Sequence, residues 1–362
     1  MELENIGDIL AVLGLQGENR LSLVGSGGLS SAHVPSFPPD APALLLCPPD
    51  FNLDALSRVL TAVYPQSFLL RLVSKEFLVQ EIPISALADQ SAVAVYVPAL
   101  GPGSSFEAFQ ELIAHLRAPE DGCPWDKEQT HASLRKHLLE EAYETLSAMD
   151  DADPEKMCEE FGDLLLQVVL NAQIATEAGE FNMADILQGI HAKIVRRHPH
   201  VFGQVEVDGV ANVLSNWEKI KAGERKKQGN SEKGILDGLP AALPALTQAQ
   251  EFQDRAARVG FDWPEISGVL DKIKEEILEV EATTNQAELT DELGDLFFVL
   301  VNLARWKKVD AEAALRAASV KFKTRFKYIE HQAQLSQRAM QELSLGEMDA
   351  LWNDAKRSER KA

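Results

Sequence analysis

Two stretches of this sequence carry acidic residues in the same arrangement. Each has two carboxylates three residues apart, then a break, then another such pair: Glu141, Glu144, Glu160 and Asp163 in the first, and Glu276, Glu279, Glu292 and Asp295 in the second. Positions i and i+3 of a helix share a face, so two helices joined by a turn would direct four carboxylates at one point. Gathered like charges raise one another's pKa unless a cation lies among them. Each stretch therefore predicts a metal site.

The ligand set indicates which metal and which chemistry. Sites built from carboxylates alone favour Mg2+, with Mn2+ as the alternative, over zinc. Mg2+ takes part of its coordination shell from substrate phosphates. A bound metal polarises a phosphoryl group and lowers the pKa of a bound water. Glu276 or its neighbour Glu275 could position or deprotonate that water, so these two are the catalytic candidates.

An ordinary solvated acidic face is the alternative for these stretches. Against it, each second pair lies in a Glu-x-Gly-Asp sequence that leads directly into an apolar run, at 164–166 and 296–298. Glycine inside a helix costs about 1 kcal/mol. A close approach of helices around the metal would explain Gly162 and Gly294.

A phosphate ligand also needs fixed positive charge. Lys272 lies one helical turn before Glu276, and Lys321 and Arg325 lie four residues apart on a later predicted helix. Arginine can clamp phosphate oxygens through two parallel hydrogen bonds. Trp352 could stack on a base or lie in a core. For any single lysine, the alternative to a phosphate contact is simple exposure to solvent.

The first stretch repeats most of this set. Lys193 and Arg197 have the spacing of the later Lys/Arg pair, whereas His137 replaces the early lysine. The same number of residues separates Glu141 from Trp217 as separates Glu276 from Trp352. One helical unit has therefore been duplicated.

The elements that must position these residues are mainly helices. Apolar periodicity predicts helices over 130–149, 153–179, 182–197 and 210–226, and again over 243–260, 266–284, 286–309, 310–333 and 345–360, with a glycine-rich linker at 229–234. Residues 1–103 instead predict strands at 43–47, 67–73, 77–84 and 92–97 around a helix at 53–64. We expect a mostly α fold: a small α/β domain (1–103), a first repeat (104–228) and a second repeat (235–362).

Composition narrows the class of protein. A net charge of −21 argues against a general nucleic-acid or membrane-surface binder, which needs basic excess. The 3 cysteines show no metal-ligand spacing, as is typical of reduced thiols. The acidic N-terminus is unlike a signal peptide, and no apolar run is long enough to span a membrane. We expect a cytoplasmic protein.

Several motifs together resemble the MazG family of nucleoside triphosphate pyrophosphohydrolases, over about residues 106–360. They are GCPWDKEQT (122–130), LEEAYE (139–144), EFGDLL (160–165) and RRHPHVF (196–202), then VGFDW (259–263), EEILE (275–279) and ELGDLF (292–297). The resemblance implies an all-α fold with a four-helix core, a homodimer, and Mg2+-dependent hydrolysis of a nucleoside triphosphate to the monophosphate and diphosphate by water attack at the α-phosphorus.

The resemblance also implies roles for residues. The metal ligands would be Glu276, Glu279, Glu292 and Asp295, and the nucleotide contacts would be Lys272, Lys321, Arg325 and Trp352. In this family the second unit tends to be the catalytic one; the intact carboxylates of the first repeat leave its activity open. Residues 1–103 are similar to the latter half of a tetrapyrrole-methylase-type domain, without its cofactor loop, so we expect no methyl transfer.

Two alternatives remain open from the sequence. The chain could be a non-catalytic nucleotide-sensing or interaction scaffold, which would bind nucleotide without releasing diphosphate. As an enzyme, it could have broad or house-cleaning specificity, since no motif identifies a base or sugar preference.

Overall fold

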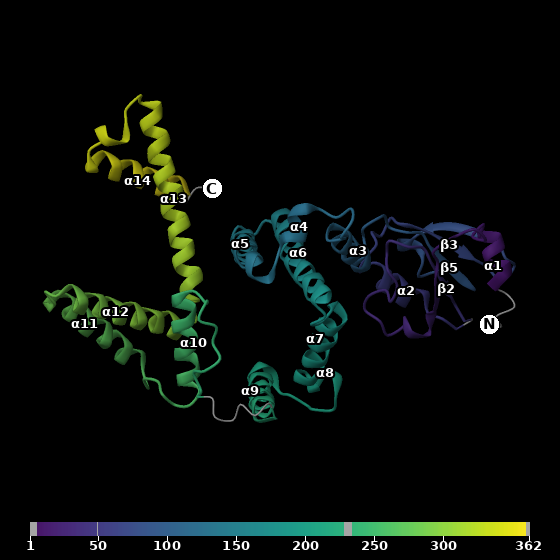
Figure 1. The fold of residues 1–362 in the computed structure, drawn as a ribbon, viewed down its shortest axis with the longest axis horizontal. Helices are drawn as coiled ribbons and strands as arrows, with labels where there is room; N and C mark the ends of the chain where they lie inside the picture. The colour runs from purple at the N-terminus through teal and green to yellow at the C-terminus, as the bar shows by residue number, and fades with distance from the viewer. Residues whose placement is uncertain (1–5, 49, 228–233, 360–362) are drawn as a thin grey trace. The chain divides into compact units, whose positions relative to one another are not determined.

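A computed structural model describes residues 6–48, 50–227 and 234–359 (Figure 1). The chain divides into two compact units, an N-terminal unit ending at Ile194 and a C-terminal unit beginning at Val195. The boundary falls inside α7 (Met183–Arg197), so the compact units do not coincide with the two sequence repeats. The domain limits expected from the sequence therefore stay a prediction, and the expected linker at 229–234 lies almost wholly outside the described residues.

A five-stranded sheet forms the first part of the N-terminal unit, in the order β1-β2-β5-β3-β4. Its strands are β1 (Ser22–Gly25), β2 (Ala43–Leu46), β3 (Leu69–Val73), β4 (Val79–Pro83) and β5 (Ala94–Val97). Strands β1 and β2 are parallel, and the other neighbours are antiparallel. This confirms the four strands expected within residues 43–97 and adds β1.

Helices cover both faces of that sheet. Helix α2 (Leu53–Leu60) packs Leu56 and Leu60 on one face together with Leu45 and Val95. Helix α1 (Ile6–Leu13) packs on the other face, against the strand residues that alternate with these. Successive side chains of a strand point to opposite faces of the sheet, so one strand contributes apolar residues to the cores on both faces. Short 3₁₀ turns lie at Ser26–Gly28 and Ile84–Ala86.

Helices make up the rest of the N-terminal unit: α3 (Phe106–Leu116), α4 (Pro124–Glu128), α5 (His131–Asp150), α6 (Pro154–Ala178) and α7. Helices α5 and α6 form a hairpin, and α3 packs on α6. Asp153 caps α6 by accepting hydrogen bonds from the backbone of Glu155 and Lys156. Gly179 ends the helix with a φ of 70°, a conformation that suits glycine.

The C-terminal unit is helical: α8 (Pro199–Phe202), α9 (Gly209–Lys227), α10 (Ala245–Ala257), α11 (Ile266–Ala282), α12 (Gln286–Trp306), α13 (Ala311–Leu335) and α14 (Leu345–Glu359), with a 3₁₀ turn at Met340–Glu342. Figure 1 shows two hairpins here, α11–α12 and α13–α14, and α10 packs against α12 and α13. The expected helices are confirmed. The expected end of the last helix, at residue 360, lies outside the described residues.

The mostly α fold class is thus confirmed. Each acidic hairpin, α5–α6 or α11–α12, has only two helices. Neither hairpin by itself therefore makes the four-helix core that the resemblance implies. Among the described helices, none is long and apolar enough to cross a membrane.

Candidate metal and nucleotide site

The α11–α12 hairpin brings its acidic residues together as the spacing predicts. Glu276 and Glu279 lie on α11 and Glu292 lies on α12, and one carboxylate oxygen from each falls within 4.8 Å of the other two. The connection between the helices is short, and Asn285 caps α12 by accepting a hydrogen bond from the backbone of Ala287. This tight turn is what places the two helical acid pairs face to face.

Electrostatics within this cluster are unfavourable. Burial raises the pKa of Glu292 above its usual value, and the neighbouring Glu279, Glu276 and Asp295 add to the rise. Asp295, the expected fourth ligand, thus lies near the cluster, although it is outside the group whose oxygens fall within 4.8 Å. Concentrated negative charge of this kind is relieved by a cation.

One oxygen of Glu276 lies where a divalent cation would find a ligand. The residue is only 3% exposed. Its Oε1 pairs with Lys272 Nζ at 2.7 Å, while its buried Oε2 has no hydrogen-bond partner among the described residues. A buried polar atom without a partner is costly. A divalent cation bound by oxygen ligands would supply that partner, so the residues present fit such an ion.

Lys272 is an internal counter-ion in this structure. Its Nζ lies 2.7 Å from Glu275 as well as 2.7 Å from Glu276. Hydrogen bonds to Glu275 and then to Glu276 raise the pKa of Lys272 above its usual value. The lysine expected to contact nucleotide therefore pairs with the two residues expected to be catalytic.

The α5–α6 hairpin of the first repeat holds the equivalent cluster. Oxygens of Glu141, Glu144 and Glu160 lie within 4.8 Å of one another. Burial raises the pKa of Glu141, and Asp163 and Glu144 add to the rise. His137, which replaces the lysine, lies with Nδ1 3.6 Å from a carboxylate oxygen of Glu140. Among the residues that the structure describes, this cluster therefore has no counterpart of the Lys272–Glu276 pair.

The later cations gather on the other hairpin of the C-terminal unit. Arg325 on α13 binds Glu359 on α14 at 2.7 Å, and its Cζ lies 5.3 Å from the ring centroid of Trp352. Lys321 is exposed one turn earlier on α13. The structure thus brings Arg325 and Trp352 together, on a hairpin separate from the carboxylates of α11–α12.

The first repeat contains the same pairing. Arg197 on α7 binds Glu224 on α9 at 2.7 Å, and Arg196 binds the same carboxylate at 2.6 Å. Hydrogen bonds from Arg197 and then Arg196 lower the pKa of Glu224 to about 2. Lys221 lies 5.5 Å from the ring centroid of Trp217, and Lys193 is exposed on α7.

The two glutamate partners, Glu224 and Glu359, were not among the site residues expected from the sequence. Glu224 and Glu359 each lie seven residues after a repeated tryptophan, on the same helix. Seven residues is about two helical turns, so each pair shares a face. That repeated spacing was the available signal.

One structural explanation from the sequence is wrong. A Cβ atom added at Gly162 or Gly294 would meet no atom within 4 Å. Neither glycine is needed for a close approach of helices within the described chain.

These features define a class of helical protein in which carboxylates on a hairpin can hold a divalent cation. Comparisons with known proteins identify the family. The MazG nucleotide pyrophosphohydrolase domain matches residues 129–202 and again residues 265–329. The chain belongs to the MazG nucleotide pyrophosphohydrolase family, and it is a hydrolase that acts on acid anhydrides.

Two relatives show how far the similarity extends. The nucleoside triphosphate pyrophosphohydrolase/pyrophosphatase MazG of Thermotoga maritima is 43% identical over 254 residues, which cover 70% of this chain and 96% of that protein. The nucleoside triphosphate pyrophosphohydrolase of Escherichia coli K12 is 44% identical over 253 residues, which cover 68% of this chain and 95% of that protein.

Proposed function

This protein hydrolyses nucleoside triphosphates to the monophosphate and diphosphate, and we propose that it does so with Mg2+ held by Glu276, Glu279, Glu292 and Asp295 of the second repeat. The observation that carries the proposal is the buried, unpartnered oxygen of Glu276 inside a three-carboxylate cluster. Its all-oxygen ligand set favours Mg2+, with Mn2+ as the alternative. The relatives named above have this activity by name.

The roles of the chain's residues follow from their contacts. When bound, the metal would polarise the phosphoryl oxygens and offset their negative charge. Glu275 is exposed beside the cluster and is our candidate to take the proton of the attacking water, with Glu276 as the second candidate. Water oxygen bonds to the α-phosphorus, the bond from that phosphorus to the bridging oxygen breaks, and diphosphate leaves.

Lys272 would change partners in this scheme. It now neutralises Glu275 and Glu276. A divalent cation on Glu276 would take over that neutralisation and release Nζ for a phosphate oxygen. Lys321, Arg325 and Trp352 are the proposed further nucleotide contacts.

The first repeat is the weaker candidate for catalysis. We propose that Glu141, Glu144, Glu160 and Asp163 bind a metal and that Lys193 and Arg197 meet phosphate. Its cluster lacks the lysine that would move onto substrate, since His137 lies against Glu140 instead.

We also propose a homodimer. Large apolar side chains on α11 and α12 are exposed, including Leu278 at 63% and Phe297 at 58%. Two such hairpins, one from each copy, would make a four-helix core and bury those side chains. The cytoplasmic location, the lack of nucleic-acid or membrane partners, and the broad or house-cleaning specificity stay predictions from the sequence.

The test is product analysis with Mg2+ and each nucleoside triphosphate in turn. We expect a nucleoside monophosphate and diphosphate as products. Release of orthophosphate and a nucleoside diphosphate would contradict the reaction type. Competition between ordinary and damaged nucleotides would then rank the substrates.

A double variant tests the site itself. Glu276→Gln with Glu279→Gln removes two ligand charges while keeping side-chain volume, and should lower the rate by at least about 1,000-fold. The matched double variant, Glu141→Gln with Glu144→Gln, measures how much of the hydrolysis rate depends on the first repeat. Circular dichroism of both variants checks that the helices are retained. Full activity of the first double variant would contradict the proposed site.

A further inference from the structure

The ion pair between Arg325 and Glu359 uses one particular edge of the guanidinium. Nε lies 3.1 Å from both carboxylate oxygens of Glu359, and Nη2 lies 2.7 Å from Oε2. A two-point contact of this kind fixes the plane of the guanidinium as well as its position. It leaves Nη1, which makes no hydrogen bond to any residue in the described chain, for another acceptor.

A second contact constrains the same guanidinium. Its Cζ lies 5.3 Å from the ring centroid of Trp352, at a distance typical of cation–π contacts. Phe322 also lies against that ring, with centroids 5.3 Å apart. Glu359 and Trp352 share one face of α14, so this single helix holds Arg325 by a carboxylate and by an aromatic ring.

The ion pair recurs in the first repeat, where Arg197 meets Glu224, seven residues after Trp217. There the cation over the tryptophan is Lys221 rather than the arginine. Glu224 also binds Arg196, whereas Glu359 binds Arg325 alone in the described chain. The glutamate has thus been kept with its arginine in both copies of the unit, although the surrounding contacts differ.

We propose that Glu359 is a positioning residue for substrate binding: it holds Arg325 over Trp352 with Nη1 turned toward the position of a phosphate oxygen. The inference rests on the proposed function, in which Arg325 contacts the nucleotide. Glu359 acts through Arg325, because a carboxylate would repel the phosphates if it met them directly.

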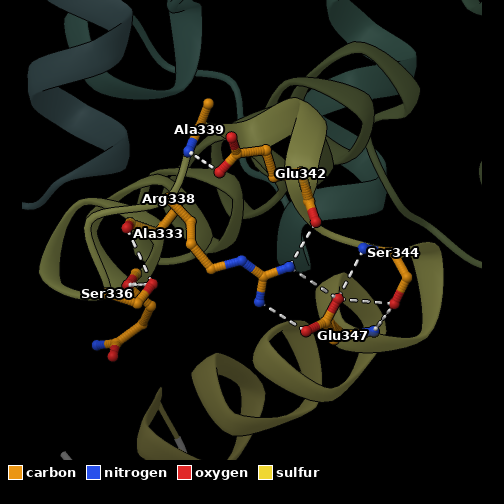
Figure 2. A network of polar contacts seen from close by, with 8 residues as sticks. Ala333, Ser336, Arg338, Ala339, Glu342, Ser344 and Glu347 are labelled. Carbon is orange, nitrogen blue, oxygen red and sulfur yellow. Dashed lines mark hydrogen bonds and ion pairs between the residues drawn. The ribbon is translucent and has the colours of Figure 1, made fainter.

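The positioning role must be distinguished from a purely structural one, in which the ion pair only stabilises the packing of α14 on α13. The same hairpin offers a matched control. Arg338 binds Glu347 at 2.7 Å near the connection between α13 and α14 (Figure 2). Glu347 also accepts hydrogen bonds from Ser344, at the start of α14. Both glutamates lie on α14 and bind one arginine, but Glu347 is at the far end of the helix from Glu359.

The experiment compares Glu359→Gln with Glu347→Gln in the full chain, by steady-state kinetics of diphosphate release with Mg2+ and ATP. We expect Glu359→Gln to raise KM about 10-fold and to leave kcat within about 3-fold, because a charged two-point contact is lost but the carboxylate cluster is intact. Glu347→Gln should keep the KM of the wild type. Glu359→Asp, which retains the charge, should recover part of the KM.

The outcomes are distinguishable. Equal KM in both glutamine variants would overturn the inference, and a lower KM in Glu359→Gln would overturn it by showing that Glu359 competes with phosphate. If the wild type releases no diphosphate, the proposed function fails by itself. In that case, calorimetric binding of an α,β-methylene triphosphate analogue tests the inference instead of the kinetics. The dissociation constants of the two glutamine variants should then differ by the same factor of about 10.

Discussion

At the scale of residues, the two repeats differ most in the cation beside the acids. The second repeat places Lys272 on Glu276, while the first has His137 near Glu140. An internal cation of this kind offsets the negative charge of the carboxylates. In the proposed scheme, Lys272 of the second repeat would also supply the positive charge that a phosphate needs, and the first repeat has no lysine at the equivalent position.

The pKa of Glu292 leads to a prediction about pH. Burial and neighbouring acids raise this pKa above its usual value, so at a pH just above the usual glutamate pKa the folded protein without metal binds more protons than the unfolded chain. Stability of the metal-free protein therefore falls as pH rises through the raised pKa. A metal must displace that proton, so the gain in melting temperature on adding Mg2+ should grow as the pH rises through the raised pKa of Glu292.

Thermal melts with Mg2+ or with a chelator, over that pH range, measure this effect. The Glu276→Gln with Glu279→Gln variant is the control, because its weakened ligand set should remove the difference between the two conditions. If Mg2+ raised the melting temperature by the same amount at every pH, metal binding would not be linked to loss of a proton, and the prediction would be wrong.

At the scale of elements, the acidic hairpins are positioned by local features. Caps at Asp153 and Asn285 begin the second helix of each hairpin, and the acids follow at helical spacing. The glycine in each Glu-x-Gly-Asp sequence lies within α6 or α12, with open space where a side chain would be. Its entropic cost is therefore not offset by a packing contact inside the described chain.

Gly294→Ala tests whether that face of α12 is open in the assembled protein. If it is, alanine should raise the free energy of unfolding by about 1 kcal/mol, through helix propensity and a less flexible unfolded chain. Urea denaturation measures the change, and Gly162→Ala is the matched variant on α6. A loss of stability in Gly294→Ala would show instead that another surface packs closely against Gly294.

At the scale of the whole molecule, the apolar side chains exposed on α11–α12 offer a surface for a partner. The hairpin presents Ile277, Leu278, Phe297 and Phe298, each more than 40% exposed. Exposed apolar area of this kind next to a charged cluster is typical of an interface. The proposed homodimer would cover it with a second copy of the hairpin.

Phe297→Glu should therefore shift the protein from dimer to monomer, because it puts a charge into an apolar contact that is desolvated on association. Sedimentation velocity at micromolar concentration measures the shift. Leu345→Glu is the control, since Leu345 is 84% exposed on α14, outside the acidic hairpin. A wild-type protein that sediments as a monomer would contradict the dimer.

The sequence by itself determined the helices, the two acid pairs on each hairpin and the duplication, because all three depend on local spacing along the chain. Only the tertiary structure decided which partners the charged side chains take on other helices. Lys272 pairs with Glu275 and Glu276, and Arg325 pairs with Glu359. The second of these contacts joins residues on different helices, whose facing sides are fixed by packing. Helical spacing alone leaves that choice open, since a charged side chain on an exposed face can reach several acceptors.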